Sequence, residues 1–150
     1  MQNKLFITHE TSKKIQYIQI ITGNSDTIKI NKILTKPTYV YETYLFIILN
    51  NNDKINIETN FFINNKNIKA DIFLKAVLFN KSSLVHTGLI KISKKGTLAK
   101  AYLSSKILLL SHEAKAISQP NLEIETNDVQ ASHGSAIGTL NDEEIFYLNT

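Results

Sequence analysis

The amino-acid sequence predicts an all-β protein, and two observations lead to this class. Apolar and polar residues alternate along several short runs, most clearly over Ile68–Leu78, and period two is typical of a strand with one buried face. Clusters of Asn, Asp, Gly and Ser separate these runs, as turns separate short strands. Only the C-terminal end keeps the period of an amphipathic helix.

The predicted strands follow the alternation. Ile68–Leu78 is long enough for one half-buried strand or for two strands that meet at a bend. Pro120 would open one strand, a position where its missing N–H is tolerated. In chain order the strands are Thr27–Asn31, Lys54–Glu58, Ile68–Leu78, Leu89–Ile92, Ile107–Leu110, Asn121–Glu125 and Val129–His133.

The turn signals lie between these runs. Lys94–Ser105 is the one internal segment that could be helical, although Gly96 and the serine pair at its end weaken that interpretation. The predicted turns are Gly23–Asp26, Asn50–Asp53, Asn64–Asn65, Asn80–Ser83, Ser93–Gly96 and Thr126–Asp128.

A short helix is predicted at the C-terminal end. Asn141 is a good N-cap, and Glu144 three residues later completes a capping-box pattern. The apolar Ile145, Phe146 and Leu148 would form one side of this helix. Two turns are marginal alone, so such a helix needs a surface to pack against.

The architecture stays open at this level. Short strands separated by turns fit a sandwich, a barrel or a β-solenoid equally. The lack of a clean repeat counts mildly against a solenoid, and short strands rich in Ile, Val and Asn count mildly for one. No Gly-, Pro- or Ser-rich linker divides residues 1–150, so we expect one domain.

The composition excludes several classes of site. The 150 residues are 43% hydrophobic and include no Cys, which rules out disulfides, thiolate zinc sites and a cysteine nucleophile from this chain. All 17 basic residues are lysines, and the absence of Arg argues against bidentate recognition of phosphate or guanine. The excess of Ile, Asn and Lys fits drift in an AT-rich genome, so single Lys or Asn residues carry little functional information.

Charge is uneven along the chain. Residues 76–110 contain six lysines and no acid, whereas residues 111–150 contain one lysine and seven acids. The lysine block at 76–110 could bind an acidic partner or RNA, although such a block is more often a solvated face. The longest apolar run, Tyr39–Leu49, contains Glu42 and is too short to span a membrane.

Four histidines are the candidates for metal or proton chemistry near neutral pH: His9, His86, His112 and His133. We expect His9 to be solvated, His86 to lie at a strand end and His112 to make a hydrogen bond or a helix cap. His133 has the most unusual neighbours, because Gly134 follows it and allows a bend or the close approach of another chain.

The residues around His133 limit its chemistry. On a strand, Ala131 and His133 share one face at a distance that suits a shared metal, but alanine is no ligand. Ser132 and His133 point in opposite directions, so they form no nucleophile–base pair. Residues 134–138 match neither a nucleophile elbow nor a phosphate loop.

Three runs together resemble the core of the SufB/SufD family, the scaffold subunits of the SUF iron–sulfur cluster assembly system. They are Pro120–Ile124, Asn127–Gly138 and Ile145–Leu148, and the Lys75–Leu78, Gly88 and Lys106–Leu110 positions fit the same family in order. The resemblance is strongest over 75–150, and the Ser132-His133-Gly134 run is more similar to the SufD type.

The resemblance implies a fold and a role. The fold would be a right-handed parallel β-helix, a β-solenoid, over residues 1–150, with the short C-terminal helix after it. The chain would be a scaffold and not an enzyme, paired with a SufB-like subunit and working with the SufC ATPase. His133 would lie at that subunit interface with Ala131, Ser132 and Gly134, as a candidate ligand of iron or of a transient iron–sulfur cluster shared with the partner.

Three departures from the family pattern stand out. Ala131 occupies a position that is often Cys, so the Cys-His ligand pair is absent. The Arg-Gly that usually follows Phe146-Tyr147-Leu148 is replaced by Asn149-Thr150, and the helices that should follow are missing. These departures put SufC docking in doubt and indicate a form shortened at both ends.

The leading hypothesis is therefore a shortened SufD-like scaffold that binds neither membrane nor nucleic acid. We expect a soluble protein of the cytoplasm, or of a plastid or organelle stroma if it is encoded there. The alternatives are a β-rich RNA- or ribosome-associated protein that uses the 76–110 lysine block, and a degraded, non-functional remnant.

Overall fold

The computed structural model describes residues 3–24, 26–140 and 144, and nearly all of them lie in strands or in the turns between strands. The ten strands are β1 (Asn3–Thr11), β2 (Lys14–Thr22), β3 (Asp26–Leu34), β4 (Val40–Leu49), β5 (Lys54–Ile63), β6 (Lys69–Leu78), β7 (Ser83–Ile92), β8 (Lys100–Leu109), β9 (Lys115–Ile124) and β10 (Gln130–Thr139).

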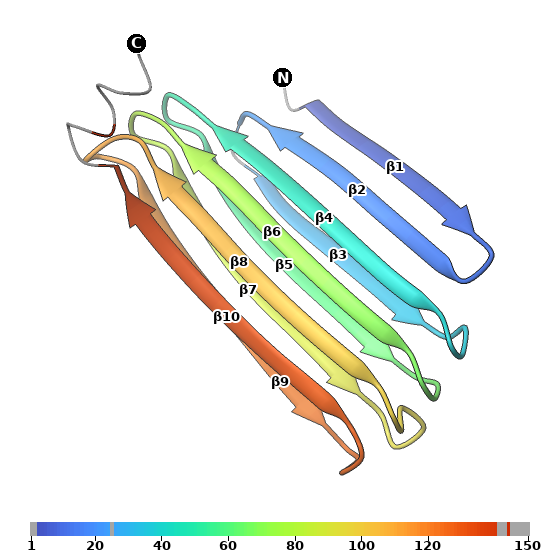
Figure 1. Cartoon of the computed structure of the whole chain (residues 1–150). Helices are drawn as coiled ribbons and strands as arrows, with labels where there is room; N and C mark the ends of the chain where they lie inside the picture. The colour runs from blue at the N-terminus through green and yellow to red at the C-terminus, as the bar shows by residue number, and fades with distance from the viewer. Residues whose placement is uncertain (1–2, 25, 141–143, 145–150) are drawn as a thin grey trace.

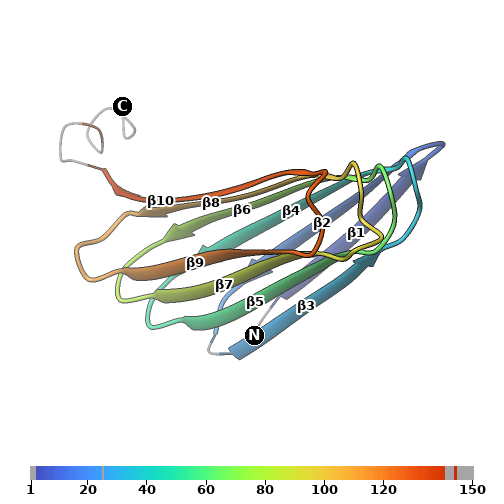
Figure 2. The same cartoon turned by 90° about the horizontal axis from the view of Figure 1, so that it is seen from below.

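The strands form two stacked sheets. One sheet has the order β1-β2-β4-β6-β8-β10 and the other β3-β5-β7-β9, so from β2 onward the chain crosses between the sheets at every turn (Figure 1). Figure 2 shows the two layers from the side, with β10 above β9 at one end. We call the six-stranded layer sheet A and the four-stranded layer sheet B.

Every strand pair is parallel except β1 with β2. The register partners Val40, Lys69, Lys100 and Gln130 of sheet A lie 29, 31 and 30 residues apart, so each coil of the chain is one rung of a solenoid. The predicted parallel β-solenoid is confirmed, because sandwiches are built from antiparallel strands and barrels close one sheet on itself.

Alternation along each strand builds the core. In β6, Ile72 and Leu74 point inward and are fully buried, whereas Lys75 is exposed. Leu45 of β4 lies level with Leu74 and is also buried, so apolar side chains stack from rung to rung. The absence of an obvious repeat did not mean the absence of a solenoid, because the inward positions accept Ile, Leu, Ala or Thr.

Asparagines shape the turns. Asn51 and Asn80 both have positive φ, 51° in each case, a conformation that Asn tolerates better than most residues. The two turns stack, since the Asn80 side chain donates to Asn50 Oδ1 at 2.6 Å and the Lys81 N–H donates to the Asn51 carbonyl at 2.9 Å. Part of the Asn excess therefore has a structural role.

Two sequence-based predictions were wrong. Lys94–Ser105 contains no helix, because residues 94–98 form turns and Lys100 begins β8. Pro120 lies inside β9 and not at its start. The Lys115 N–H donates to the carbonyl of Ser82, directly before β7, at 3.0 Å, so odd-numbered residues of β9 bond to β7. The Pro120 nitrogen therefore faces the free edge, where no donor is needed.

The predicted C-terminal helix falls on 141–150, which lies outside the described residues apart from Glu144. Within the described ranges, no helix is long and apolar enough to cross a membrane.

Candidate functional site

Among the described residues, β9 and β10 are the last strands of the two sheets, and no further strand covers them at that end of the solenoid (Figures 1 and 2). Side chains that would be buried in an inner rung are exposed here. Ile107 of β8 is 3% exposed, whereas its register partner Ile137 of β10 is 43% exposed. Ile124 of β9 is likewise 43% exposed. We call the inward-facing surface of β9 and β10 the open end.

The edge of β10 is also unpaired in the described part of the chain. The Gln130 N–H donates to the carbonyl of Ala99, directly before β8, at 2.9 Å, so the even-numbered residues of β10 bond to β8. The N–H and C=O groups of odd-numbered residues, including His133, therefore face the free edge. Such an edge is a template for a strand of another chain.

His133 lies on the open end. It is level with Leu103 of β8, a fully buried inward-facing residue, so its side chain projects on the core side of the sheet yet is exposed. Ala131 shares that face and is half-buried. Ser132 and Gly134 belong to the outer face, and a Cβ added at Gly134 would meet nothing within 4 Å.

Among the described residues, His133 belongs to no cluster of metal-binding side chains. Within the described ranges, no three His, Asp or Glu side chains are grouped to hold a metal ion. Of Ala131, Ser132, His133 and Gly134, His133 supplies an imidazole, which is a suitable ligand group for iron.

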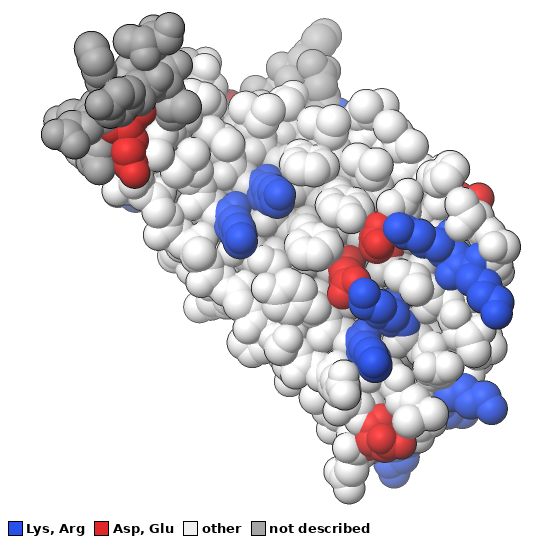
Figure 3. All heavy atoms as spheres, in the orientation of Figure 1, with Lys and Arg blue, Asp and Glu red and all other residues white. Residues whose placement is uncertain are grey.

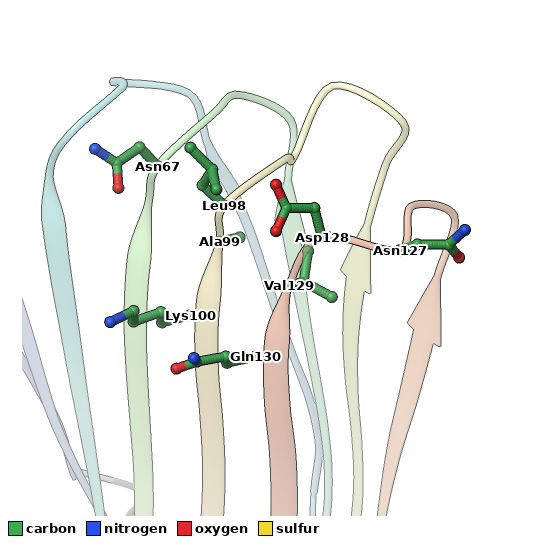
Figure 4. Close-up of a pocket in the computed structure, with 8 residues that line it drawn as sticks. All are labelled: Asn67, Leu98, Ala99, Lys100, Asn127, Asp128, Val129 and Gln130. Carbon is green, nitrogen blue, oxygen red and sulfur yellow. The ribbon is translucent and has the colours of Figure 1, made fainter.

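A shallow pocket of about 310 Å³ lies beside the turns that lead into β6, β8 and β10. Figure 4 shows Asn67, Leu98 and Asp128 at these turns, with Lys100 and Gln130 on the adjoining strands. Leu98 N–H donates to the Asp128 carbonyl at 2.6 Å, which ties two successive turns together. With one carboxylate and one lysine, the pocket offers no catalytic pair, and His133 does not line it.

His86 lies where the sequence interpretation did not place it. It is in the middle of β7, on the same face as Leu84 and Ile90, and is 0% exposed. Its Nε2 is 3.1 Å from Thr59 Oγ1 and its Nδ1 is 3.1 Å from Ser118 Oγ. Burial lowers the pKa of the imidazole to about 4, so the ring is neutral near pH 7. Continuing the alternation through Leu84-Val-His would have predicted its inward position.

The polar contacts of His86 extend further. Ser118 Oγ and Ser105 Oγ share a hydrogen bond at 2.9 Å, which links β5, β7, β9 and β8 through one series of side chains. Gly88 leaves room for the ring, because a Cβ there would lie 3.1 Å from His86 Cε1 and 2.8 Å from Leu103 Cδ2. We call Thr59, His86, Ser118 and Ser105 the polar column.

The other histidines are at the surface. His9 is exposed on β1. His112 is exposed in the turn before β9, on an open pocket that also includes Lys54 and Lys115.

The 76–110 lysine block is not a continuous basic face. Lys91 pairs with Glu123 at 2.6 Å and with Glu125 at 3.1 Å, and Lys81 pairs with Glu113 at 3.4 Å. On the face shown in Figure 3, the lysines lie in small groups, several of them beside acidic side chains, and do not form a continuous basic stripe. This distribution argues against a nucleic-acid surface.

Comparison with known proteins adds independent support for a family. A family model described as "SUF system FeS cluster assembly, SufBD core domain" matches residues 2–150. The chain is 33% identical over 76 residues to the iron–sulfur cluster assembly protein SufD of Escherichia coli, which is 51% of this chain and 18% of that protein.

Longer but weaker matches cover most of the chain. It is 25% identical over 136 residues to SufD of Bacillus subtilis, which is 90% of this chain and 31% of that protein. It is 24% identical over 140 residues to a SufBD family protein of Galdieria sulphuraria, which is 93% of this chain and 63% of that protein. The chain thus spans less than two thirds of these relatives. With a parallel β-solenoid and a family match over nearly its whole length, the chain belongs to the SufBD core domain family of the SUF system.

Proposed function

We propose that this chain is a SufD-like scaffold subunit for iron–sulfur cluster assembly, which pairs through its open end with a SufB-like subunit. The observation that carries this proposal is the open end itself. It combines uncovered apolar side chains with a free parallel strand edge, in a chain of the SufBD core domain family.

The physical basis for pairing is that no described strand follows β9 and β10 to form a further rung. A solenoid buries each rung against its neighbours, so a terminal rung without a polar cap exposes apolar surface. Ile124 and Ile137 are the exposed examples, and a covering strand would bury them and pair with the β10 edge. At about 25 cal/mol per Å² of apolar surface, this burial favours association.

The two edges of the open end differ. Pro120 removes one donor from the free edge of β9, whereas β10 contains no proline. We therefore expect the partner to add its strand to β10, which contains His133, and to cover β9 mainly through side-chain contacts.

In this proposal the iron or the nascent cluster is cargo that passes through the complex. His133 supplies one imidazole nitrogen, which is a suitable ligand for iron, and the SufB-like subunit supplies the others. The chain catalyses no reaction alone. A SufC-like ATPase would act on the pair, and the location in the cytoplasm or an organelle stroma stays a prediction.

Co-expression of this chain with SufB-like and SufC-like subunits from the same organism tests the proposal. We expect an affinity tag on this chain to retain the SufB-like subunit, and the complex to contain iron. The His133→Ala variant should keep the complex and lose the iron, because alanine provides no ligand. Iron analysis of the purified complexes measures this.

The matched control is His9→Ala, which removes an exposed histidine of β1 at the opposite edge of sheet A and should leave both complex and iron unchanged. Failure of the wild-type chain to retain a SufB-like subunit would overturn the proposed function. An intact complex with unchanged iron in His133→Ala would remove His133 as a ligand and leave only the scaffold role.

A further inference from the structure

The polar column is a series of hydrogen-bonded polar side chains that extends from the buried core of the solenoid to the open end. Thr59 and His86 are 0% exposed and Ser105 is 1% exposed, whereas Ser118 of β9 is only half-buried. Ser118 belongs to the last strand of sheet B, and Ser105 is level with Ser135 of the last strand of sheet A. The column therefore extends from the buried interior to the open end, where the described residues form no further rung.

A count of hydrogens shows that one donor remains unused. With a neutral imidazole, the four members of the column carry one polar hydrogen each. Three hydrogen bonds connect them, Thr59–His86, His86–Ser118 and Ser118–Ser105. Within the described residues these side chains make no other hydrogen bond, so one hydrogen is left over.

The tautomer of His86 decides where that hydrogen lies. If Nε2 carries the proton, it donates to Thr59, and the Thr59 hydroxyl is left without an acceptor in the sealed core. If Nδ1 carries the proton, Thr59 donates to Nε2 and Nδ1–H donates to Ser118. The two serine hydroxyls can share their hydrogen bond in either direction, and when the buried Ser105 donates to Ser118 the spare hydrogen belongs to the half-buried Ser118. A buried unsatisfied donor is costly, so the structure favours the second arrangement, which directs the spare donor to the open end.

We propose that the SufB-like partner covers the open end with an inward-facing hydrogen-bond acceptor placed over Ser118, and that this contact selects partner and register. This inference rests on the proposed function. The surrounding apolar side chains, such as Leu122 and Ile137, can pack against almost any apolar strand of a partner, so they provide little selectivity. A polar group can be satisfied only by a rung with an acceptor at that level, and a rung without one leaves the donor unpaired.

Binding of the purified SufB-like subunit to this chain tests the inference, with calorimetry as the measurement. Ser118→Ala removes the donor and should weaken binding about tenfold, whereas Ser118→Thr keeps a hydroxyl and should bind nearly as the wild type does. The control is Gln119→Ala, which changes the next residue on the outer face and should have no effect. Thermal unfolding of each variant shows whether the free chain still folds.

The tautomer of His86 can be measured in the wild-type chain, so this second test does not depend on whether a variant folds. ¹⁵N NMR of the wild-type chain at pH 7 should show the Nδ1–H tautomer of His86, with slower exchange of that proton once the partner is bound. The Nε2–H tautomer would overturn the inference.

The outcomes separate the two proposals. A wild-type complex whose affinity is unchanged by Ser118→Ala would overturn this inference alone. No complex with the wild-type chain would overturn both this inference and the proposed function.

Discussion

At the scale of single residues, His86 and His133 occupy opposite environments. Both lie on inward-facing positions of strands, but a further rung covers His86, while His133 is on the last rung. His86 is consequently a neutral, hydrogen-bonded core residue, and His133 is exposed and able to bind a group from outside. The chemistry of a histidine here depends on which rung contains it and not on its neighbours in sequence.

The depressed pKa of His86 predicts a pH dependence of stability. The folded value is about 4 against 6.5 for an ordinary histidine, so between these values the unfolded chain binds a proton that the folded chain does not. The free energy of unfolding should therefore fall as the pH is lowered from about 6.5 to about 4, by about 3 kcal/mol from this group. Urea unfolding followed by circular dichroism at a series of pH values measures it.

The control for this prediction is His86→Gln, which cannot titrate. Carboxylates also titrate toward pH 4, so the comparison concerns the difference between the two proteins. That difference should shrink as the pH falls through this window. Parallel curves for wild type and variant would contradict the assignment.

At the scale of the strand, close packing between sheets limits side-chain size. Gly88 of β7 faces Leu103 of β8 across the core and lies beside the His86 ring. A strand glycine with such neighbours marks a close approach that a side chain would obstruct. Gly134 of β10 has no such neighbours, so close packing does not require a glycine at that position.

Two glycine variants test this difference. Gly88→Ala places a Cβ 2.8 Å from Leu103 Cδ2 and should lower the free energy of unfolding by about 1–3 kcal/mol through overpacking. Gly134→Ala meets nothing within 4 Å and should leave stability nearly unchanged. Urea unfolding of both variants provides the measurement, and equal effects would contradict the packing argument.

At the scale of the whole molecule, the solenoid is a stack in which each rung contacts only its neighbours. Stability in such folds is close to a sum of rung and interface terms, so the last rung has fewer stabilising contacts than the middle. We therefore expect β10 to be less stable than the inner strands of sheet A. It is also part of the proposed docking surface.

Hydrogen exchange should show this gradient. Amides of β6 should exchange most slowly, and those of β10 should alternate, with Ser132 slower than Ala131 and His133 because only even-numbered residues donate to β8. Residue-resolved exchange by NMR measures the pattern. Binding of the SufB-like subunit should then slow the odd-numbered amides, and uniform exchange along β10 would contradict the edge geometry.

The sequence by itself determined the all-β class, the inward residues of β6 and most turn positions, because alternation and turn chemistry are local properties. It also determined that residues 131–134 contain one imidazole and no thiolate, since residue 131 is Ala.

Only the tertiary structure decided how the strands pair and which side chains of different rungs are in contact. Alternation is the same in a sandwich and in a solenoid, so the parallel register at 29–31 residues could not be read from composition or periodicity. The polar column joins residues 27 and 32 positions apart, and Pro120 is tolerated inside β9 because that strand is an edge. Both features arise from stacking of rungs, which brings together residues that no local pattern connects.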